Sequence, residues 1–316
     1  MRREWSVALA IVALAIVLAF SAPSYFSIEN LRDLFLVNVP VLVVAIGATL
    51  VVLTGEIDIS VGSAFAVSSV AAGVAAKAGM PPLIAGAIAC AVGAALGLLN
   101  GALVAFGRIP SIVVTLAAMV ALRDGLRWIT QGAWVENLPG RFQWLGLTQA
   151  SFPVASGIAV GLLVVAVAWA LRDLAAGRAL YATGSNAEGA RLASINTSVV
   201  KLLAFAAAGS LTGLAALLNS VRFNQIPSNT GLGLEMKVIA SVVVGGAAIT
   251  GGRGTIAGTV LGVTLLGGIG PALTFLGVSA QWERAVQGLI ILAAVTVDAL
   301  RAHRAGRAPA KAAAGV

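Results

Sequence analysis

The chain has 316 residues, of which 59% are hydrophobic and 10% are charged, and its formal net charge is +8. Soluble domains carry about 25% charged residues, so this composition excludes an ordinary soluble protein. The single cysteine, Cys90, and the single histidine, His303, leave too few ligands for a disulfide framework or a metal site built on these residues. No basic face interleaved with aromatic residues accompanies the positive charge, so we expect no metal, cofactor or nucleic-acid partner.

Apolar runs long enough to cross a bilayer recur along the chain, since a core of about 30 Å needs about 20 helical residues. These runs lie at 5–22, 37–54, 59–77, 83–106, 109–129, 154–171, 201–221, 235–250, 255–276 and 284–300. The first could be a signal peptide, but Phe20-Ser21-Ala22 is a poor cleavage site and we interpret the run as a retained helix. The sequence thus predicts an all-α polytopic membrane protein with about ten transmembrane helices in one domain, residues 1–316.

Lysine and arginine in the short loops indicate the orientation, because they concentrate on the cytoplasmic side of the membrane. With ten alternating spans and the N-terminus inside, 12 of the 20 basic residues become cytoplasmic. They are Arg2, Arg3, Arg108, Arg172, Arg178, Arg191, Lys201, Arg253, Arg301, Arg304, Arg307 and Lys311. We therefore expect both termini, the basic tail 301–316 and the polar segment 181–201 on the cytoplasmic side.

The segment "LTGEIDISVGS", residues 53–63, joins the second and third predicted spans. Its carboxylates would each cost about 2.5–3.5 kcal/mol at mid-bilayer, which places them at a helix end or in a protein-lined cavity. Asp58 and Ser60 are positioned to cap the following helix. The segment is either a tight cytoplasmic turn or a moving element near an inner gate. The residues of this candidate inner-gate turn are Gly55, Glu56, Asp58, Ser60 and Gly62.

A second segment, "ITGGRGTIAG" at 249–258, echoes the first at a constant offset of 196 residues. Thr54, Gly55 and Gly62 match Thr250, Gly251 and Gly258, and both segments fall at cytoplasmic turns. This agreement indicates a pseudo-repeat of two halves in the same orientation, as occurs in transporters.

Small and polar residues inside the spans have two readings. Glycines at every fourth position, Gly93, Gly97, Gly101 and Gly254, Gly258, Gly262, favour close helix packing within one subunit over a dimer seam. Polar residues in the spans either line a substrate pathway or bond a neighbouring helix. The pathway candidates are Asn38, Thr49, Asn100, Thr115, Asn219 and Glu235.

Several catalytic patterns are missing from the sequence. It contains no G-x-x-x-x-G-K-[ST] phosphate loop, no G-x-S-x-G elbow, no H-E-x-x-H helix and no chain of acidic residues and histidines within the spans. We therefore predict that the chain is not an enzyme and does not hydrolyse ATP itself. Any energy source then lies in another subunit.

Four ordered segments together resemble one family. They are "GEIDISVGS" at 55–63, "NGALVAFGRIPSIVVTLAAM" at 100–119, "YATGSNAEGARLASINT" at 181–197 and "NTGLGLEMKVIASVVVGGAAITGGRGTIAGTVLG" at 229–262. They are similar to the permease subunits of ribose-type bacterial ABC importers, a group that includes rhamnose, xylose and autoinducer-2 permeases. The segments "TQGAWVENLPGRFQWLG" at 130–146 and "NTGLGLEMK" at 229–237 most resemble the autoinducer-2 and rhamnose permeases.

This resemblance implies a permease of the bacterial inner membrane that pairs with a second permease, identical or not. It also implies two cytoplasmic ATPase subunits and a periplasmic sugar-binding protein that delivers a sugar-like substrate. Segment 181–201 would be the coupling segment that docks on the ATPase. Its candidate coupling residues are Gly184, Asn186, Glu188, Ala190 and Arg191. Ser194 stands where the family often has glycine, so the turn at that point is an open question.

Two other function classes compete with the importer permease. An ion-coupled secondary transporter of a small polar solute would also suit a half-repeat, but the spans lack an intramembrane carboxylate relay. A membrane enzyme acting on lipid-linked substrates would need catalytic residues clustered at one face, and the sequence shows no such cluster. We expect the importer permease.

Overall fold

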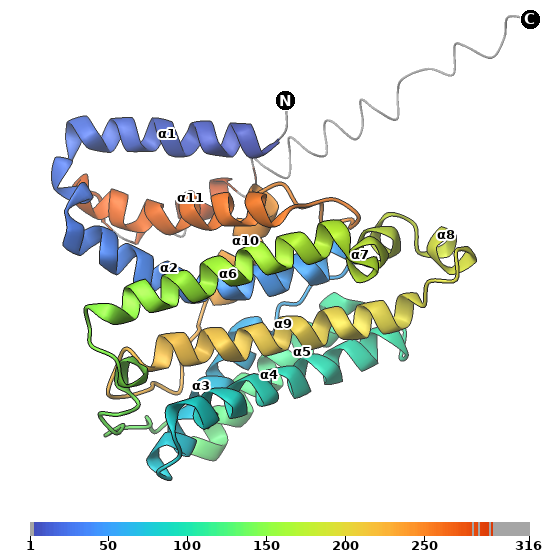
Figure 1. Ribbon diagram of the computed structural model, residues 1–316, viewed down its shortest axis with the longest axis horizontal. Coiled ribbons are helices and arrows are strands. Elements are labelled where there is room, and N and C mark those ends of the chain that lie inside the picture. The colour runs from blue at the N-terminus through green and yellow to red at the C-terminus, as the bar shows by residue number, and fades with distance from the viewer. Residues whose placement is uncertain (1–2, 280, 284, 291, 293–316) are drawn as a thin grey trace, which may run out of the picture.

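The computed structural model describes residues 3–279, 281–283, 285–290 and 292, and within them the chain is mainly helical (Figure 1). The only β pairing in this part is the isolated bridge between Val135 and Ile226. The α-helices are α1 (Arg3–Ser21), α2 (Ile28–Leu53), α3 (Val61–Lys77), α4 (Pro82–Ala105), α5 (Ser111–Thr130), α6 (Ser151–Asp173), α7 (Ala175–Ser185), α8 (Ala187–Leu192), α9 (Thr197–Ser220), α10 (Leu234–Val244) and α11 (Ile256–Phe275). Two 3-10 helices, η1 (Pro23–Phe26) and η2 (Gln143–Gly146), complete them. The all-α prediction is confirmed.

The first nine predicted spans each overlap a helix. Six helices of the described part, α1, α2, α4, α6, α9 and α11, are long and apolar enough to cross a membrane. The predicted span 235–250 is wrong in length, because α10 ends at Val244, directly before Gly245 and Gly246. Its 11 residues rise only about 16 Å, roughly half a bilayer core. The tenth predicted span and the tail 301–316 lie largely or wholly outside the described residues, and the count of ten stays a prediction.

The long helices lie roughly along one direction, and α7 and α8 project together at one end of the bundle (Figure 1). The helix α2 is mostly buried, whereas α1 and α6 are mostly exposed. Large apolar side chains on α6, Val154, Ile158, Leu162 and Val165, form an exposed stripe at helical spacing. Such a stripe suits contact with lipid, so α2 occupies the centre of the bundle and α6 its edge.

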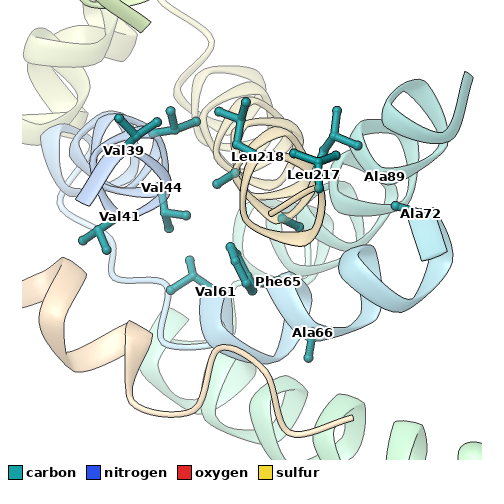
Figure 2. Packing of buried hydrophobic residues seen from close by; sticks show 14 of the residues in the cluster. Val39, Val41, Val44, Val61, Phe65, Ala66, Ala72, Ala89, Leu217 and Leu218 are labelled. Atoms are coloured by element: carbon teal, nitrogen blue, oxygen red, sulfur yellow. The ribbon is translucent and has the colours of Figure 1, made fainter. Parts of the chain in front are cut away.

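The core joins α2, α3, α4 and α9. In Figure 2, Val61 and Phe65 of α3 lie near Val44 of α2. Leu217 of α9 points toward α4, where its side chain lies against Gly86. Phe65 and Leu217 are almost fully buried. This core fixes the position of α3, and therefore of the turn that precedes it.

Close packing of α4 on α9 depends on glycine. A Cβ added at Gly93 would overlap the Gly209 carbonyl oxygen, and one added at Gly97 would overlap that of Phe205. A similar contact holds α11 to α10, where Gly262 faces the Ser241 carbonyl. The prediction that these glycines pack helices within one subunit is confirmed.

Replacing Gly93 with alanine should destabilise the protein by about 1–3 kcal/mol, because the added methyl meets backbone that cannot move aside. The matched control is Gly161→Ala on α6, where the methyl would enter open space. Alanine favours a helix by up to about 1 kcal/mol over glycine, so the control should be neutral or slightly stabilising. Thermal unfolding of the purified protein in detergent measures both variants. Equal midpoints for the two would contradict the packing.

Candidate functional site

Three segments meet backbone to backbone at the end of the bundle where α7 lies. The turn 54–60 follows α2, the turn 245–255 joins α10 to α11, and α7 packs against both. The Gly252 amide donates to the Leu53 carbonyl at 3.0 Å. A Cβ added at Gly184 of α7 would overlap that same carbonyl oxygen and lie 2.6 Å from the Gly252 nitrogen. We call this contact of Gly55, Gly184, Gly251 and Gly252 the glycine junction.

The two turns of the junction have similar backbones. Gly55 has a φ of +82° and Gly251 a φ of +87°, which side chains rarely adopt. A Cβ added at Gly251 would lie 2.7 Å from the Gly55 Cα, so neither turn leaves room for a side chain between them. The matched pair Gly55 and Gly251 therefore lies together in space, whereas Gly62 and Gly258 contact different neighbours, and the pseudo-repeat stays a prediction.

Two side-chain contacts reinforce the junction. The Tyr181 hydroxyl of α7 donates to the Gly254 carbonyl at 2.8 Å. Lys201, near the start of α9, forms a hydrogen-bonded ion pair with Glu56 of the turn 54–60. Both ends of segment 181–201 are thus tied to the turns, and a displacement of the segment must move the turns with it.

The turn 54–60 is held from inside by a buried polar chain. Asn100 of α4 donates to the Ser60 hydroxyl at 2.9 Å, and Ser60 donates in turn to the Asp58 carboxylate at 2.6 Å. Burial raises the pKa of the Asp58 carboxyl, while the hydrogen bonds from Ser60 lower it. Ser60 precedes α3 but its hydroxyl makes no capping bond to the helix. The prediction that its oxygen caps α3 is therefore wrong, because that hydroxyl is engaged by Asp58 and Asn100.

Segment 181–201 contains the end of α7, all of α8 and the start of α9. Asn186 caps α8 by accepting from the Gly189 amide at 2.9 Å, and Ala190 is buried against the rest of the protein. Glu188 lies exposed in the first turn of α8. Arg191 is exposed as well and donates through Nε to Thr197 Oγ1 at 3.0 Å. The candidate coupling residues thus include a cap, a buried anchor and two exposed charges.

The turn after α8 contains Ser194, which stands where the family often has glycine. Its φ is +63°, the left-handed region in which glycine is favoured. The Ile195 amide donates to the Ala190 carbonyl at 3.0 Å, which closes the end of α8. The turn therefore keeps the conformation that glycine would adopt, and serine occupies it with some strain.

A cavity of about 900 Å³ opens beside this segment. Its walls come from the loop 106–110, segment 191–198 and the start of α9. Arg108, Arg191 and Lys201 line it together with Glu56. The cavity therefore carries a net positive charge at the end of the bundle where α7 and α8 project.

The pathway candidates on α2 face α11. Thr49 Oγ1 lies 2.7 Å from Thr259 Oγ1, fully buried between the two helices. Asn38 donates to the Leu34 carbonyl, and its Oδ1 lies against Gly267 with no partner among the described residues. In this conformation both residues contact a neighbouring helix.

The remaining candidates lie elsewhere. Thr115 of α5 donates to the Ile57 carbonyl at 3.3 Å and so supports the turn 54–60. Asn219 lines a cavity of about 180 Å³ near the loop after α9. Glu235, at the start of α10, lies buried 4.0 Å from Arg123 of α5. The candidates do not converge on one place, and their role in a pathway stays a prediction.

Sequence reasoning missed three residues of these contacts as site residues. Arg123 is a charged residue inside the predicted span 109–129, close to Asp124 and Arg127. Tyr181 and Lys201 stood at the ends of the polar segment, but no spacing in the sequence connects them to Gly254 and Glu56. A buried charge within a predicted span is the signal that could have singled out Arg123.

Replacing Gly184 with alanine should destabilise the protein by about 1–3 kcal/mol, because the methyl would overlap backbone of both turns. In the control Gly189→Ala the methyl meets only the Asn186 side chain, at 3.2 Å. That side chain can shift, so the control should unfold near the wild-type temperature. The midpoint of thermal unfolding in detergent measures both. A wild-type midpoint for Gly184→Ala would show that α7 is not packed on the turns.

The ion pair between Lys201 and Glu56 can be measured with a double-mutant cycle. Both side chains are largely buried, so Lys201→Met leaves an unpaired carboxylate and should cost about 3 kcal/mol or somewhat less. Adding Glu56→Gln should recover much of this loss, because the second change removes the unpaired charge. Additive effects of the two substitutions on the unfolding free energy would mean that the pair is not coupled.

Comparison with known proteins agrees with this architecture. A protein-family model described as "Branched-chain amino acid transport system / permease component" matches residues 30–295. The autoinducer 2 import system permease protein LsrC of Yersinia pseudotuberculosis serotype O:3 (strain YPIII) is 38% identical over 297 residues, which cover 94% of this chain and 84% of the relative. The protein of the same name from Salmonella typhi is 38% identical over 301 residues, 94% of this chain and 85% of the relative. No solved structure matches. The chain belongs to this family of transport-system permease components, which confirms the resemblance found in its sequence.

Proposed function

We propose that this chain is the membrane-spanning permease subunit of an ATP-driven importer for a sugar-like small molecule. The observation that carries this function is the glycine junction, which connects the projecting helices α7 and α8 to both turns at the end of the bundle. The family name refers to branched-chain amino acids, whereas the relatives above are named for autoinducer 2 import. Because those relatives match 94% of the chain, autoinducer 2 or a similar molecule is the favoured cargo.

The partners follow from what this chain lacks. Its sequence has no phosphate loop, so separate cytoplasmic ATPase subunits would supply the energy. A second permease, identical or different, would complete the pathway across the inner membrane, and a periplasmic binding protein would deliver the substrate. In this arrangement the end of the bundle with α7 and α8 faces the cytoplasm. Glu4, near the start of α1, accepts a hydrogen bond from Thr255 at that end, which supports a cytoplasmic N-terminus.

Coupling would proceed through the contacts of segment 181–201. When the ATPases close, they displace α7 and α8, and Gly184 leaves no space for the displacement to be absorbed. Tyr181 pulls on the turn 245–255, and Lys201 pulls on the turn 54–60. The helices α3 and α11 begin directly after these turns, so both would move together and change access to the pathway.

Replacing Arg191 or Asn186 with alanine tests the coupling. Coupling free energies between sites are typically about 1–3 kcal/mol, so loss of coupling should lower substrate-stimulated ATP hydrolysis and uptake about tenfold. The assay uses the permease with its ATPases and binding protein in liposomes. The control is Arg172→Ala, an exposed arginine at the end of α6, which should behave as wild type.

Two outcomes would contradict this function. Normal substrate-stimulated ATP hydrolysis in both variants would show that the coupling assignment is wrong. Uptake by the purified chain under an ion gradient, without any ATPase, would support the secondary transporter instead.

A further inference from the structure

A charged pair lies buried where α3, α5 and α10 meet. Arg123 of α5 and Glu235 of α10 approach to 4.0 Å between Nη2 and Oε2, with side chains only 15% and 10% exposed. This separation exceeds the 2.7–3.2 Å of an N–H···O hydrogen bond. The two charges therefore attract each other but do not bond.

The pair carries unused hydrogen-bonding atoms on both sides. Within the described part of the chain, Arg123 Nη1 and Nη2 and Glu235 Oε2 are buried and have no hydrogen-bond partner. The other atoms of the pair are engaged: Arg123 Nε donates to Ser63 Oγ at 3.3 Å, and Glu235 Oε1 accepts from the Gly233 amide at 3.3 Å. Leaving buried charged groups unbonded is costly, so this arrangement calls for a physical explanation.

The surrounding backbone keeps Arg123 and Glu235 close together without a direct hydrogen bond. A Cβ added at Gly62, in the first turn of α3, would overlap Glu235 Oε2 and lie 2.6 Å from the Gly231 carbonyl oxygen. Gly231 and Gly233 have φ values of +73° and +82°, which lets the loop before α10 fold tightly against α3. Glu235 also lies in the first turn of α10 and beside that of α3, where helix dipoles favour a negative charge. The carboxylate is therefore fixed in place without a full set of hydrogen bonds.

We propose that Arg123 and Glu235 form a recognition site for the hydroxyl groups of an uncharged, polyhydroxylated substrate, an inference that rests on the proposed transport function. A hydroxyl group both donates and accepts, so neighbouring hydroxyls can accept from the guanidinium and donate to the carboxylate. Bonds of this kind to charged groups are among the stronger ones in proteins. The pair has no net charge, which favours a neutral ligand over an ion.

In this conformation the unbonded atoms are covered. A substrate can reach them only when the loop 229–233 moves away from α3, and the glycines at 231 and 233 suit such a movement. Arg123 and Glu235 would then form hydrogen bonds to the substrate through the atoms that have no partner in the closed conformation. Release would follow when the loop closes again on Gly62.

The test uses the complete importer, with its ATPases and binding protein, in liposomes and autoinducer 2 as the probe. Glu235→Gln removes the negative charge with little change in volume, and Arg123→Lys keeps the positive charge but replaces the planar guanidinium, with its fixed fork of donors, by an ammonium group. Loss of a hydrogen bond to a charged group should lower uptake about tenfold or more, since it is worth about 1.5–3 kcal/mol. The matched control is Arg127→Gln, exposed one turn further along α5, which should transport within about twofold of wild type.

The exchanged variant Arg123→Glu with Glu235→Arg separates recognition from a purely structural ion pair. Reversing the two charges restores their attraction but reverses the donors and the acceptor that meet the substrate. We expect the exchanged variant to fold, with a thermal midpoint above that of Arg123→Glu alone, and to remain inactive in uptake. Recovery of wild-type uptake would overturn the site and leave a structural ion pair, as would normal uptake by both single variants.

The failure of the transport function gives a different result. A wild-type importer that takes up leucine and not autoinducer 2 would overturn the polyhydroxylated ligand class. If the wild type takes up neither, the site is tested on the purified permease, by the rise of its thermal midpoint in high concentrations of ribose. Glu235→Gln and Arg123→Lys should abolish that rise, and the same rise in both variants would overturn the site.

Discussion

The backbone contact between α7 and two separate turns is the constraint on which this structure depends. At the glycine junction, Leu53 and Gly252 are joined by a direct hydrogen bond, and Gly184 lies against both. A side chain between two backbones can change its rotamer and absorb a displacement, whereas bare backbone cannot. Three segments far apart in the sequence therefore behave as one body at the end of the bundle where the chain projects α7 and α8.

The two turns that α7 contacts resemble each other. Gly55 and Gly251 both have a positive φ. Each turn leads into a helix with a closely packed glycine near its start: Gly62 of α3 lies against Gly231, and Gly258 of α11 lies against Gly245. The helices around these turns also contact each other through Thr49 and Thr259. A displacement of α7 would therefore reach both turns, which is the role proposed for it in a permease.

The sequence predicted the elements better than the contacts between them. Apolar runs located the long helices, and glycine spacing marked Gly93, Gly97 and Gly101 as a closely packed face without naming α9 as its partner, because both signals are local. Hydropathy did not show that α10 stops at Val244, since Ala247, Ala248 and Ile249 continue the apolar run beyond Gly245 and Gly246. Nor could it pair Arg123 with Glu235 or Gly184 with Gly252, because such pairings depend on how the chain folds back over more than 60 residues.

The turn 54–60 and the start of α3 lie between two partly or largely buried ion pairs, Glu56 with Lys201 and Arg123 with Glu235. Glu56, at one end of this stretch, is bonded to Lys201 at the end of segment 181–201, and Gly62, at the other end, lies against Glu235. The first pair is closed and the second is open, with unbonded atoms on both partners. Coupling between sites is reciprocal in free energy. If segment 181–201 acts on Arg123 and Glu235 through the turn 54–60, as proposed, a ligand bound to that pair acts back on the segment with the same coupling free energy.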